Sequence, residues 1–434
     1  MILYDLGIWS YRQGVRLASL TGNSKARHLD AGLKETWAKL RSFSENAEGR
    51  KTVWIHAASL GEFEQGRPLI ERLHRDNPDF RILLTFFSPS GYEVRKNYAE
   101  ADCVCYLPMD TPRNVRRFLK LANPAMAIFV KYEFWLNYLS ELRKRGIPTY
   151  LISGIFRESQ LFFKPYGSVY RKALEAFTHL YIQDEGSRNL LEGIGIRNTT
   201  VAGDTRFDRV TDIMRTVKPN PTLDRFCGTS EQRFSKDWAK SERNLIFMVG
   251  SSWSEDEDIY LDWLRKTKGI KGVIAPHEFD DARLRLLLEK LSGEGILLSE
   301  AQKNPETLER KKVLIIDCFG LLASAYSYAD VAFVGGGFGA GLHNINEAAV
   351  YGIPVFYGPN HSKFIEAKEM KTIGGGLAVD SRQDFEATAD RLISHPEELR
   401  ERGIKSKDYI SSKLGATDII YRDLFHFEST RKTK

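Results

Sequence analysis

The glycine-rich run at residues 335–341 is the strongest chemical signal in the sequence. An apolar segment, Val331–Val334, leads into this run, and five of its seven residues are glycine. Glycine lets a backbone approach a ligand closely, and the unpaired N–H groups that open a helix attract phosphate. We therefore predict a phosphate-binding turn, followed by a helix that begins near residues 343–344. The predicted ligand contacts here are Gly336, Gly337, Gly339, Gly341, His343 and Asn344.

Glu347 is predicted to lie on the first turn of that helix. Its carboxylate can accept hydrogen bonds from ribose hydroxyls there, or it can merely complement the helix dipole. The chain contains no G-x-x-x-x-G-K-[ST] motif, and the glycine run does not fit G-x-G-x-x-G in register, so P-loop and dinucleotide sites are disfavoured. Further candidates stand at the ends of predicted elements, where each has a structural role as its alternative: Ser251, Ser252, Pro276, His277 and Arg206.

Two glutamates follow predicted strands of the N-terminal half. Glu62 comes just after Gly61, which permits a tight turn between strand and helix, and Glu133 follows the apolar run 127–130. A partly buried carboxylate at such a strand end can act as a general base. For Glu62 the sequence alone favours the alternative that this glutamate only complements the dipole at the start of a helix. For Glu133 an ion pair with Lys131 is an equally good alternative.

Strand and helix patterns alternate through both halves of the chain, which predicts an α/β protein with parallel sheets. The strands expected in the N-terminal half are 53–58, 81–87, 102–107, 125–130, 149–152 and 180–182. Those expected in the C-terminal half are 245–249, 272–275, 313–316, 331–334 and 355–357. Two such halves predict a ligand site in a cleft that faces the carboxyl ends of both sheets.

Breaks in this rhythm predict the organisation of the chain. We expect an amphipathic and basic segment at residues 1–50, a Rossmann-like domain at 51–211, a linker at 212–243, a second Rossmann-like domain at 244–410, and a C-terminal helix at 411–434 that can cross back to the first domain. The linker is placed by its Lys-Pro-Asn-Pro sequence and the charged, weakly apolar run after it.

The composition is that of a globular protein. Of 434 residues, 42% are hydrophobic and 28% are charged, and 63 basic residues against 57 acidic ones give a net charge of +6. This modest excess does not require nucleic acid and fits an anionic small molecule or membrane surface equally well. The four cysteines are too few and too irregularly spaced for a disulfide framework or a zinc site, which favours a reducing compartment.

The first 20 residues lack the order of a signal peptide, and no stretch has the roughly 18 uninterrupted apolar residues of a membrane span. Apolar residues, two arginines, Trp9 and Tyr11 predict an amphipathic helix. Such a helix can lie among lipid headgroups or pack on the body of the protein, and the sequence does not choose between these. The basic residues Lys25, Arg27 and Arg41 follow it.

Several short motifs, taken in order, resemble those of the 3-deoxy-D-manno-octulosonic acid (Kdo) transferases, a family of GT-B glycosyltransferases in lipopolysaccharide assembly. The matching stretches are residues 56–62 (HAASLGE), 106–119 (YLPMDTPRNVRRFL), 132–137 (YEFWLN), 203–208 (GDTRFD), 250–252, 335–347 and 351–358. Each stretch alone is weakly specific, whereas the ordered set, spread over most of residues 50–370, is highly specific.

The resemblance implies a GT-B fold, a CMP-Kdo donor, a lipid A precursor as acceptor, inversion at the anomeric carbon, and no metal or cofactor. It implies that Glu62 is the general base, that Glu133 is a second acidic residue of the active site, and that the glycine turn with His343, Asn344 and Glu347 holds CMP. The second domain would then bind the donor and the first the acceptor.

The implied place of action is the cytoplasmic face of the inner membrane, with the protein attached peripherally. Lys25, Arg27, Arg41 and Arg157 are predicted to contact the anionic acceptor. Arg157 is included because residues 153–157 read Ser-Gly-Ile-Phe-Arg where many members of the family have Asn-Ala-Arg, so Arg157 can supply that cation from a shifted position. The alternatives are another GT-B enzyme with a UDP-sugar donor, and a non-catalytic peripheral protein that binds nucleotide-sugars. The oligomeric state is not predicted.

Overall fold

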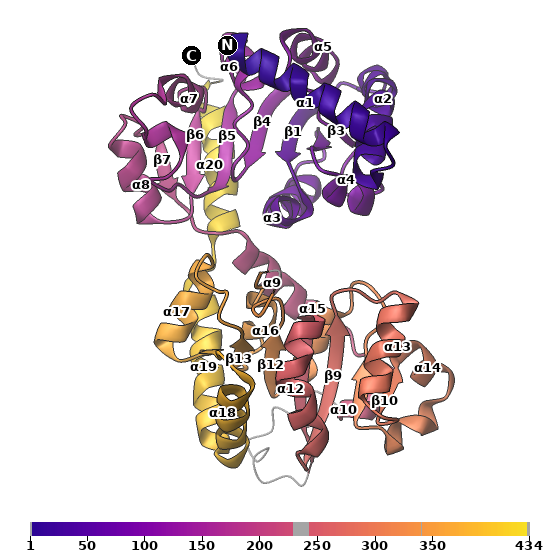
Figure 1. The fold of residues 1–434 in the computed structure, drawn as a ribbon. Helices are drawn as coiled ribbons and strands as arrows, with labels where there is room; N and C mark the ends of the chain where they lie inside the picture. Colours follow the sequence, from indigo (N-terminus) through magenta and orange to yellow (C-terminus); the bar gives the residue numbers. More distant parts are fainter. Residues whose placement is uncertain (1, 229–242, 340, 432–434) are drawn as a thin grey trace. The chain divides into compact units, whose positions relative to one another are not determined.

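A computed structural model describes residues 2–228, 243–339 and 341–431, and the chain divides into two compact units (Figure 1). Unit 1 comprises Met1–Arg209 and Leu414–Lys434, and unit 2 comprises Val210–Lys413. Of the predicted linker, residues 229–242 lie outside the described residues. The part that is described contains the end of α9 (Arg206–Arg215) and α10 (Pro221–Cys227).

Unit 1 is built on a seven-stranded parallel sheet with the order β3-β2-β1-β4-β5-β6-β7. The strands are β1 (Lys51–Ala57), β2 (Phe80–Phe86), β3 (Cys103–Tyr106), β4 (Pro124–Val130), β5 (Thr149–Gly154), β6 (His179–Ile182) and β7 (Thr199–Val201). The interiors of β1, β2 and β4 are buried on both faces, which explains their continuous apolar runs. The predicted strands of this half are confirmed, and β7 was not predicted.

Helices cover both faces of this sheet. They are α1 (Ile2–Leu20), α2 (Ser24–Glu45), α3 (Leu60–Asp76), α4 (Pro89–Arg95), α5 (Pro112–Ala122), α6 (Leu136–Lys144), α7 (Ser168–Leu174), α8 (Glu185–Glu192) and α20 (Ala416–Arg431), with a short turn η1 (Leu161–Phe163). Side chains of α5, α6 and α7 fill one core cluster, and those of α3, α4 and α20 fill another.

The C-terminal helix α20 is an integral part of unit 1. Ile420 and Leu424 are fully buried in the core beside α3. The carboxylate of Asp208 accepts hydrogen bonds from the N–H groups of Gly415 (2.8 Å) and Thr417 (2.7 Å) where the helix begins. These amides have no partner within the helix, so Asp208 acts as their cap.

Helix α1 has two different faces. Tyr4, Ile8 and Val15 pack against the core of unit 1, and the Tyr4 hydroxyl donates to Asp110 (2.7 Å). The other face is apolar and exposed, and its residues are Leu3, Leu6, Trp9, Leu17 and Leu20. The helix therefore packs on the protein and also presents an apolar stripe. None of the described helices is both long enough and apolar enough to cross a bilayer.

Unit 2 has a second seven-stranded parallel sheet, with the order β10-β11-β9-β8-β12-β13-β14. Its strands are β8 (Leu245–Ser252), β9 (Ile270–Pro276), β10 (Gly295–Leu297), β11 (Val313–Ile315), β12 (Val331–Val334), β13 (Val355–Tyr357) and β14 (Gly376–Ala378). Its other helices are α12 (Ser254–Lys266), α13 (Asp281–Lys290), α14 (Leu298–Lys303), α15 (Leu322–Ala325), α16 (Asn346–Ala349), α17 (Ile365–Ile373), α18 (Arg382–Ser394) and α19 (Pro396–Ser412), with turns η3 (Pro305–Arg310) and η4 (Tyr326–Tyr328).

Candidate active site

The candidate residues of each unit stand where the strand order of its sheet reverses. The reversal falls between β1 and β4 in unit 1 and between β8 and β12 in unit 2. Open parallel sheets bind ligands outside the carboxyl ends of the strands at such a point. Glu62 follows β1 and Glu133 follows β4, while Ser251 ends β8 and the glycine run follows β12. Topology thus brings together residues that lie far apart in the sequence of each unit.

Glu62 lies in the first turn of α3 and is half-buried. Its Oε2 accepts a hydrogen bond from the hydroxyl of Ser59, the residue before the helix. Within the described residues, Oε1 makes no hydrogen bond and no basic side chain lies within 4 Å of this carboxylate. A carboxylate that has one oxygen unoccupied can accept a proton from a bound hydroxyl.

Glu133 is held much more tightly. Its Oε2 accepts from Nε1 of Trp135 (2.6 Å) and lies 3.1 Å from Nε2 of His56, which is fully buried in β1. Nδ1 of His56 lies 2.9 Å from Oγ1 of Thr85. If Thr85 donates to Nδ1, the imidazole proton is on Nε2 and points to Glu133. Trp135 donates to Glu133 in either tautomer of His56, whereas Oε1 of Glu62 accepts no hydrogen bond among the described residues, which favours Glu62 as the group that exchanges a proton.

The hydroxyl of Tyr132 is influenced by the charges of Glu62 and of two of the predicted basic residues, Arg157 and Arg206. Burial raises the pKa of its hydroxyl, the Glu62 carboxylate raises it further, and the charges of Arg157 and Arg206 lower it. The charges of Glu62, Arg157 and Arg206 therefore all act on one phenol. Sequence analysis placed Tyr132 in a matching motif without a role, although an aromatic residue directly after a strand at the switch point was a usable signal.

Arg206 belongs to unit 1 and is bound to Asp204. Its Nε lies 2.8 Å and its Nη2 2.7 Å from Oδ2 of that carboxylate. Burial opposes ionisation of Asp204, but the charge and hydrogen bonds of Arg206 hold the pKa of the carboxyl below its ordinary value. The GDTRFD motif thus combines an arginine held by a buried carboxylate with the cap of α20.

The four predicted acceptor-binding cations do not gather in one place. Lys25, Arg27 and Arg41 are exposed on α2, and Lys25 and Arg41 are about 24 Å apart along its axis at 1.5 Å per residue. Arg157 is exposed in the loop after β5. Of the four, Arg157 is the one whose charge acts on the hydroxyl of Tyr132.

The glycine run forms a compact turn after β12. Gly336 has φ +88°, and a Cβ atom at Gly337 would lie 2.5 Å from the backbone nitrogen of Gly358, so a side chain is excluded there. The helix expected to open near residues 343–344 begins two residues later and is short. Helix α16 spans Asn346–Ala349, and Oδ1 of Asn344 accepts a hydrogen bond from the N–H of Asn346 at its start. A four-residue helix supplies little dipole, so any phosphate must bind loop amides.

Asp256 of α12 occupies part of this turn. The fully buried carboxylate accepts from the N–H groups of Gly336 (2.8 Å) and Trp253 (2.9 Å). Burial raises the pKa of Asp256 against the opposing effect of backbone hydrogen bonds from Gly336, Trp253 and Phe338. The Gly336 amide is therefore already engaged. In the described part of the turn, the amides of the buried Gly337 and the half-buried Asn344 make no hydrogen bond.

Three aromatic rings from three strand ends stack beside the turn. The ring of His277 lies 4.4 Å from that of Trp253 and 4.5 Å from that of His343. Burial and the neighbouring His277 lower the pKa of His343 to about 4, so this imidazole is neutral at pH 7, and its Nε2 accepts from Nε1 of Trp253 (3.1 Å). Trp253 was not among the predicted residues, although it directly follows Gly-Ser-Ser at a strand end.

The remaining predicted residues of unit 2 divide by exposure. Ser252 is 1% exposed and Pro276 is buried, so neither side chain faces a ligand. Ser251, with φ +54°, and Gly341 are half-buried, and Gly339 is exposed. Asn344 donates to Oε1 of Glu347 (3.1 Å). Within the described residues, no three His, Cys, Asp or Glu side chains are grouped as metal ligands.

Comparison with known proteins gives a consistent result. Residues 32–209 match the sequence profile of the family described as 3-deoxy-D-manno-octulosonic-acid transferase (kdotransferase). The transferase of that name from Chlamydia muridarum is 27% identical over 78% of each chain, and the one from Aquifex aeolicus is 26% identical over 82% of this chain and 89% of its own.

Solved structures share the fold at low sequence identity. A UDP-GlcNAc 2-epimerase from Neisseria meningitidis superposes with a TM-score of 0.59 and 16% identity, covering 87% of this chain and all of its own. MurG from Acinetobacter baumannii superposes with a TM-score of 0.52 and 11% identity, covering 85% and 98%. Two parallel-sheet α/β units of this kind constitute the GT-B fold. The chain is a glycosyltransferase with the GT-B fold, whose residues 32–209 match the Kdo transferase family and most of whose length is similar to enzymes named as Kdo transferases.

Proposed function

We propose that this protein transfers Kdo from CMP-Kdo to a lipid A precursor, with inversion at the anomeric carbon and with Glu62 as general base. One structural observation carries the assignment of the base. Glu62 is half-buried at the carboxyl end of β1, with Oε1 unoccupied in the described structure, and its charge acts, with those of Arg157 and Arg206, on the half-buried phenol of Tyr132. The family supports a Kdo donor and a lipopolysaccharide precursor as acceptor.

The proposed step is a single displacement. Oε1 of Glu62 takes the proton of an acceptor hydroxyl while the oxygen attacks the anomeric carbon of Kdo. The bond from that carbon to the phosphate oxygen breaks, and CMP leaves with the bonding electron pair. One displacement at one carbon inverts its configuration. Arg157, which is exposed and whose charge acts on Tyr132, would bind an anionic group of the acceptor.

Unit 2 supplies the donor site in this proposal. The free amides of Gly337 and Asn344 can donate to the phosphate of CMP and stabilise the charge that develops as CMP leaves. His343 adds no charge, because it is neutral at pH 7. The exposed ring of His277, stacked on Trp253, offers a flat surface for the cytosine base.

We infer that α1 attaches the protein to the cytoplasmic face of the inner membrane. The exposed stripe holds four leucines at 57–85% exposure together with Trp9 at 57% on one helix face. An apolar face that a protein core leaves uncovered can lie at the headgroup boundary, and the exposed Lys25 and Arg27 that follow would face anionic lipid. An acceptor that carries acyl chains is held in such a layer.

The direct test incubates purified protein with CMP-Kdo and a tetra-acylated lipid A precursor. We expect release of CMP and a lipid product heavier by one or more Kdo units in its mass spectrum. A parallel thermal-shift titration compares CMP with UDP, and only CMP should stabilise the protein. Stabilisation by UDP alone, with no product from CMP-Kdo, would assign the protein to a different donor class.

A further inference from the structure

Helix α1 contacts the edge of unit 1 that carries the two candidate glutamates. Nδ2 of Asn137, at the start of α6, donates to Oδ1 of Asp5 (2.8 Å), and α6 follows β4 in the chain. Further along α1, the ring of Tyr11 stacks on that of Phe87, the residue directly after β2. Both contacts lie beyond the carboxyl ends of strands, which is where open parallel sheets bind their ligands. The proposed membrane helix therefore also borders the ligand-binding edge of the sheet.

Phe87 contacts the segments that lead to both glutamates. Its N–H donates to the carbonyl of Ala58 (3.2 Å), which lies in the turn between β1 and α3, the helix of Glu62. Its ring lies 4.7 Å from that of Trp135, and Nε1 of Trp135 donates to Glu133 (2.6 Å). Phe87 is thus hydrogen-bonded to one of these segments and packed against the other.

Tyr11, Phe87 and Trp135 form an aromatic row that leaves apolar area for a ligand. The rings of Tyr11 and Phe87 are 5.8 Å apart at an interplanar angle of 29°. Tyr11 is 46% exposed, and Phe87 and Trp135 are half-buried. Hydrocarbon that covers these rings removes apolar surface from water on both partners, which is favourable. The aromatic row therefore offers a hydrocarbon chain a path from α1 to the residue that donates to Glu133.

Two glycines of α1 lie between the aromatic row and the exposed stripe of the helix. Residues three and four apart are neighbours on a helix surface, so Gly7 and Gly14 both flank Tyr11. By the same spacing, Leu3 precedes Gly7 and Leu17 follows Gly14. A Cβ atom at either glycine would meet no further atom within 4 Å, although alanine is the better residue inside a helix. The helix surface is therefore low and open where a chain would cross from the stripe to the row.

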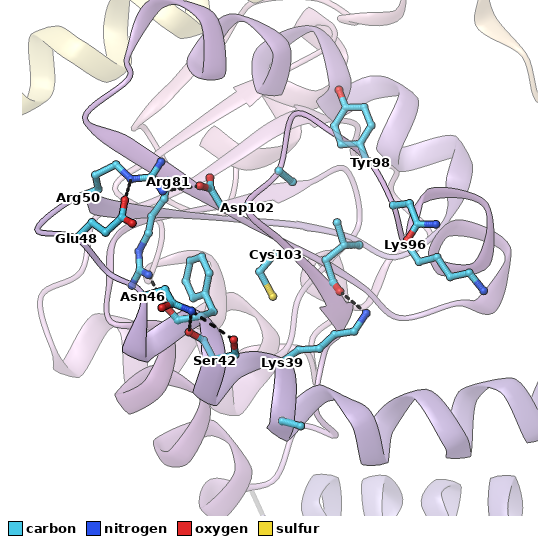
Figure 2. A pocket seen from close by; sticks show the side chains of 15 residues that line it. Lys39, Ser42, Asn46, Glu48, Arg50, Arg81, Lys96, Tyr98, Asp102 and Cys103 are labelled. Atoms are coloured by element: carbon cyan, nitrogen blue, oxygen red, sulfur yellow. Dashed lines mark hydrogen bonds and ion pairs between the residues drawn. The ribbon is translucent and has the colours of Figure 1, made fainter.

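A cavity of about 730 Å³ in unit 1 does not offer such a surface. It lies between the C-terminal half of α2 and the starts of β1, β2 and β3, at the opposite ends of the strands (Figure 2). Charged side chains dominate its wall, among them Lys39, Arg50, Arg81 and Asp102, as Figure 2 shows. Hydrocarbon placed against charged groups takes them out of water at a cost. The aromatic row is the better place for an apolar ligand.

We propose that the aromatic row binds an acyl chain of the acceptor beside its reacting sugar, so that α1 is part of the acceptor site as well as a membrane attachment. This rests on the proposed function, which makes the acceptor an acylated sugar whose hydroxyl meets Glu62. The chain leaves the lipid layer at the exposed stripe, crosses the two glycines and lies on the row. The protein then selects acceptors by their acylation, and loss of that chain weakens binding without displacing the catalytic carboxylate.

Photo-crosslinking locates the acyl chain without a transfer step. The probe is a diacylated glucosamine phosphate with a diazirine in one acyl chain near the sugar, added without donor to the full chain on phosphatidylcholine vesicles. Peptide mass spectrometry should find label on Phe87 or Trp135, at least fivefold above that left by a phosphatidylcholine with the same diazirine. Label on the stripe alone, or equal label at the row from both lipids, would overturn the proposal.

Kinetic constants separate acyl binding from a structural role. Phe87→Ala should raise KM for a tetra-acylated acceptor at least tenfold with kcat within twofold, whereas KM for the deacylated acceptor should stay within twofold. Phe87→Leu keeps an apolar side chain and should keep KM within threefold of the wild type. Phe80→Ala removes a half-buried ring from the first position of β2, roughly 23 Å from Phe87, and as the matched control should leave both constants unchanged. An equal rise in KM for both acceptors in Phe87→Ala would show a structural role and overturn the proposal.

This proposal and the proposed function can fail separately, because crosslinking uses no donor. Label on the aromatic row without Kdo transfer would refute the transfer and keep the acyl site. Kdo transfer with no label on the row, and with equal KM in the wild type and Phe87→Ala, would refute the acyl site alone.

Discussion

Placing acidic residues on the exposed stripe of α1 should release the protein from anionic vesicles without unfolding it. Leu6 and Leu17 are 57% and 64% exposed, so the folded chain gains little from their packing. Fully burying a leucine contributes roughly 1.5–3 kcal/mol, and about 60% of that for two leucines is roughly 2–4 kcal/mol. That range corresponds to a roughly 30- to 1,000-fold weaker partition of the Leu6→Asp/Leu17→Asp variant into the membrane.

Co-sedimentation with vesicles that contain phosphatidylglycerol measures this partition. The control is Leu286→Asp, which places the same charge on an exposed leucine of α13 in unit 2 and should sediment like the wild type. Melting temperatures should agree among all three proteins. If the double variant sedimented as well as the wild type, the stripe would have no role in attachment. Equal loss in the Leu286→Asp control would point to a general effect of charge.

Three further outcomes follow from single residues. Burial raises the pKa of Asp110 to about 6, so the folded chain binds a proton at this carboxyl more tightly than the unfolded chain. The contribution of Asp110 to the free energy of unfolding therefore falls by at most about 3 kcal/mol as the pH rises from 4 to 6. Urea unfolding of Asp110→Asn should lack this pH dependence. Asp208→Ala leaves two N–H groups of α20 uncapped and should lower the free energy of unfolding by about 1–2 kcal/mol, with faster hydrogen exchange at residues 415–418. His343 should show no protonation in an NMR titration from pH 8 to 5.5, because its pKa is held near 4; a midpoint near 6.5 would contradict its burial beside His277.

The fold was predictable where each strand is a long apolar run. β1, β2, β4, β8 and β9 have seven or eight residues and buried interiors, so hydrophobicity alone placed them. The strands missed by sequence analysis are β7, β10 and β14, which have three residues each and lie at sheet edges. A three-residue strand shows no periodicity. The equally short β11 and β13 were predicted because they are apolar and lie inside the sheet, buried throughout.

The sequence predicted at which strand ends the candidate residues lie, but not the hydrogen bonds that they make. Strand ends placed Glu62, Glu133 and the glycine run at the switch points, because parallel strands all end at the same edge. The roles of His56 and Asp256 were not predictable, because each depends on a hydrogen bond to a residue 77 or 80 positions away. Lys25 and Arg41 are 16 residues apart on one helix, so their separation of about 24 Å follows from the sequence once the helix is predicted. Basic residues that are neighbours in a sequence stretch need not lie together on the folded surface.

The most direct test of the central claim is the rate of Kdo transfer by Glu62→Gln, with Glu141→Gln as a control of equal charge change on α6. The amide keeps the shape of the side chain and cannot accept the hydroxyl proton. We predict turnover lower by about 10²–10⁴-fold in Glu62→Gln, with CMP affinity and melting temperature unchanged and with Glu141→Gln like the wild type. Turnover in Glu62→Gln within tenfold of the wild type would contradict the assignment of Glu62 as the base.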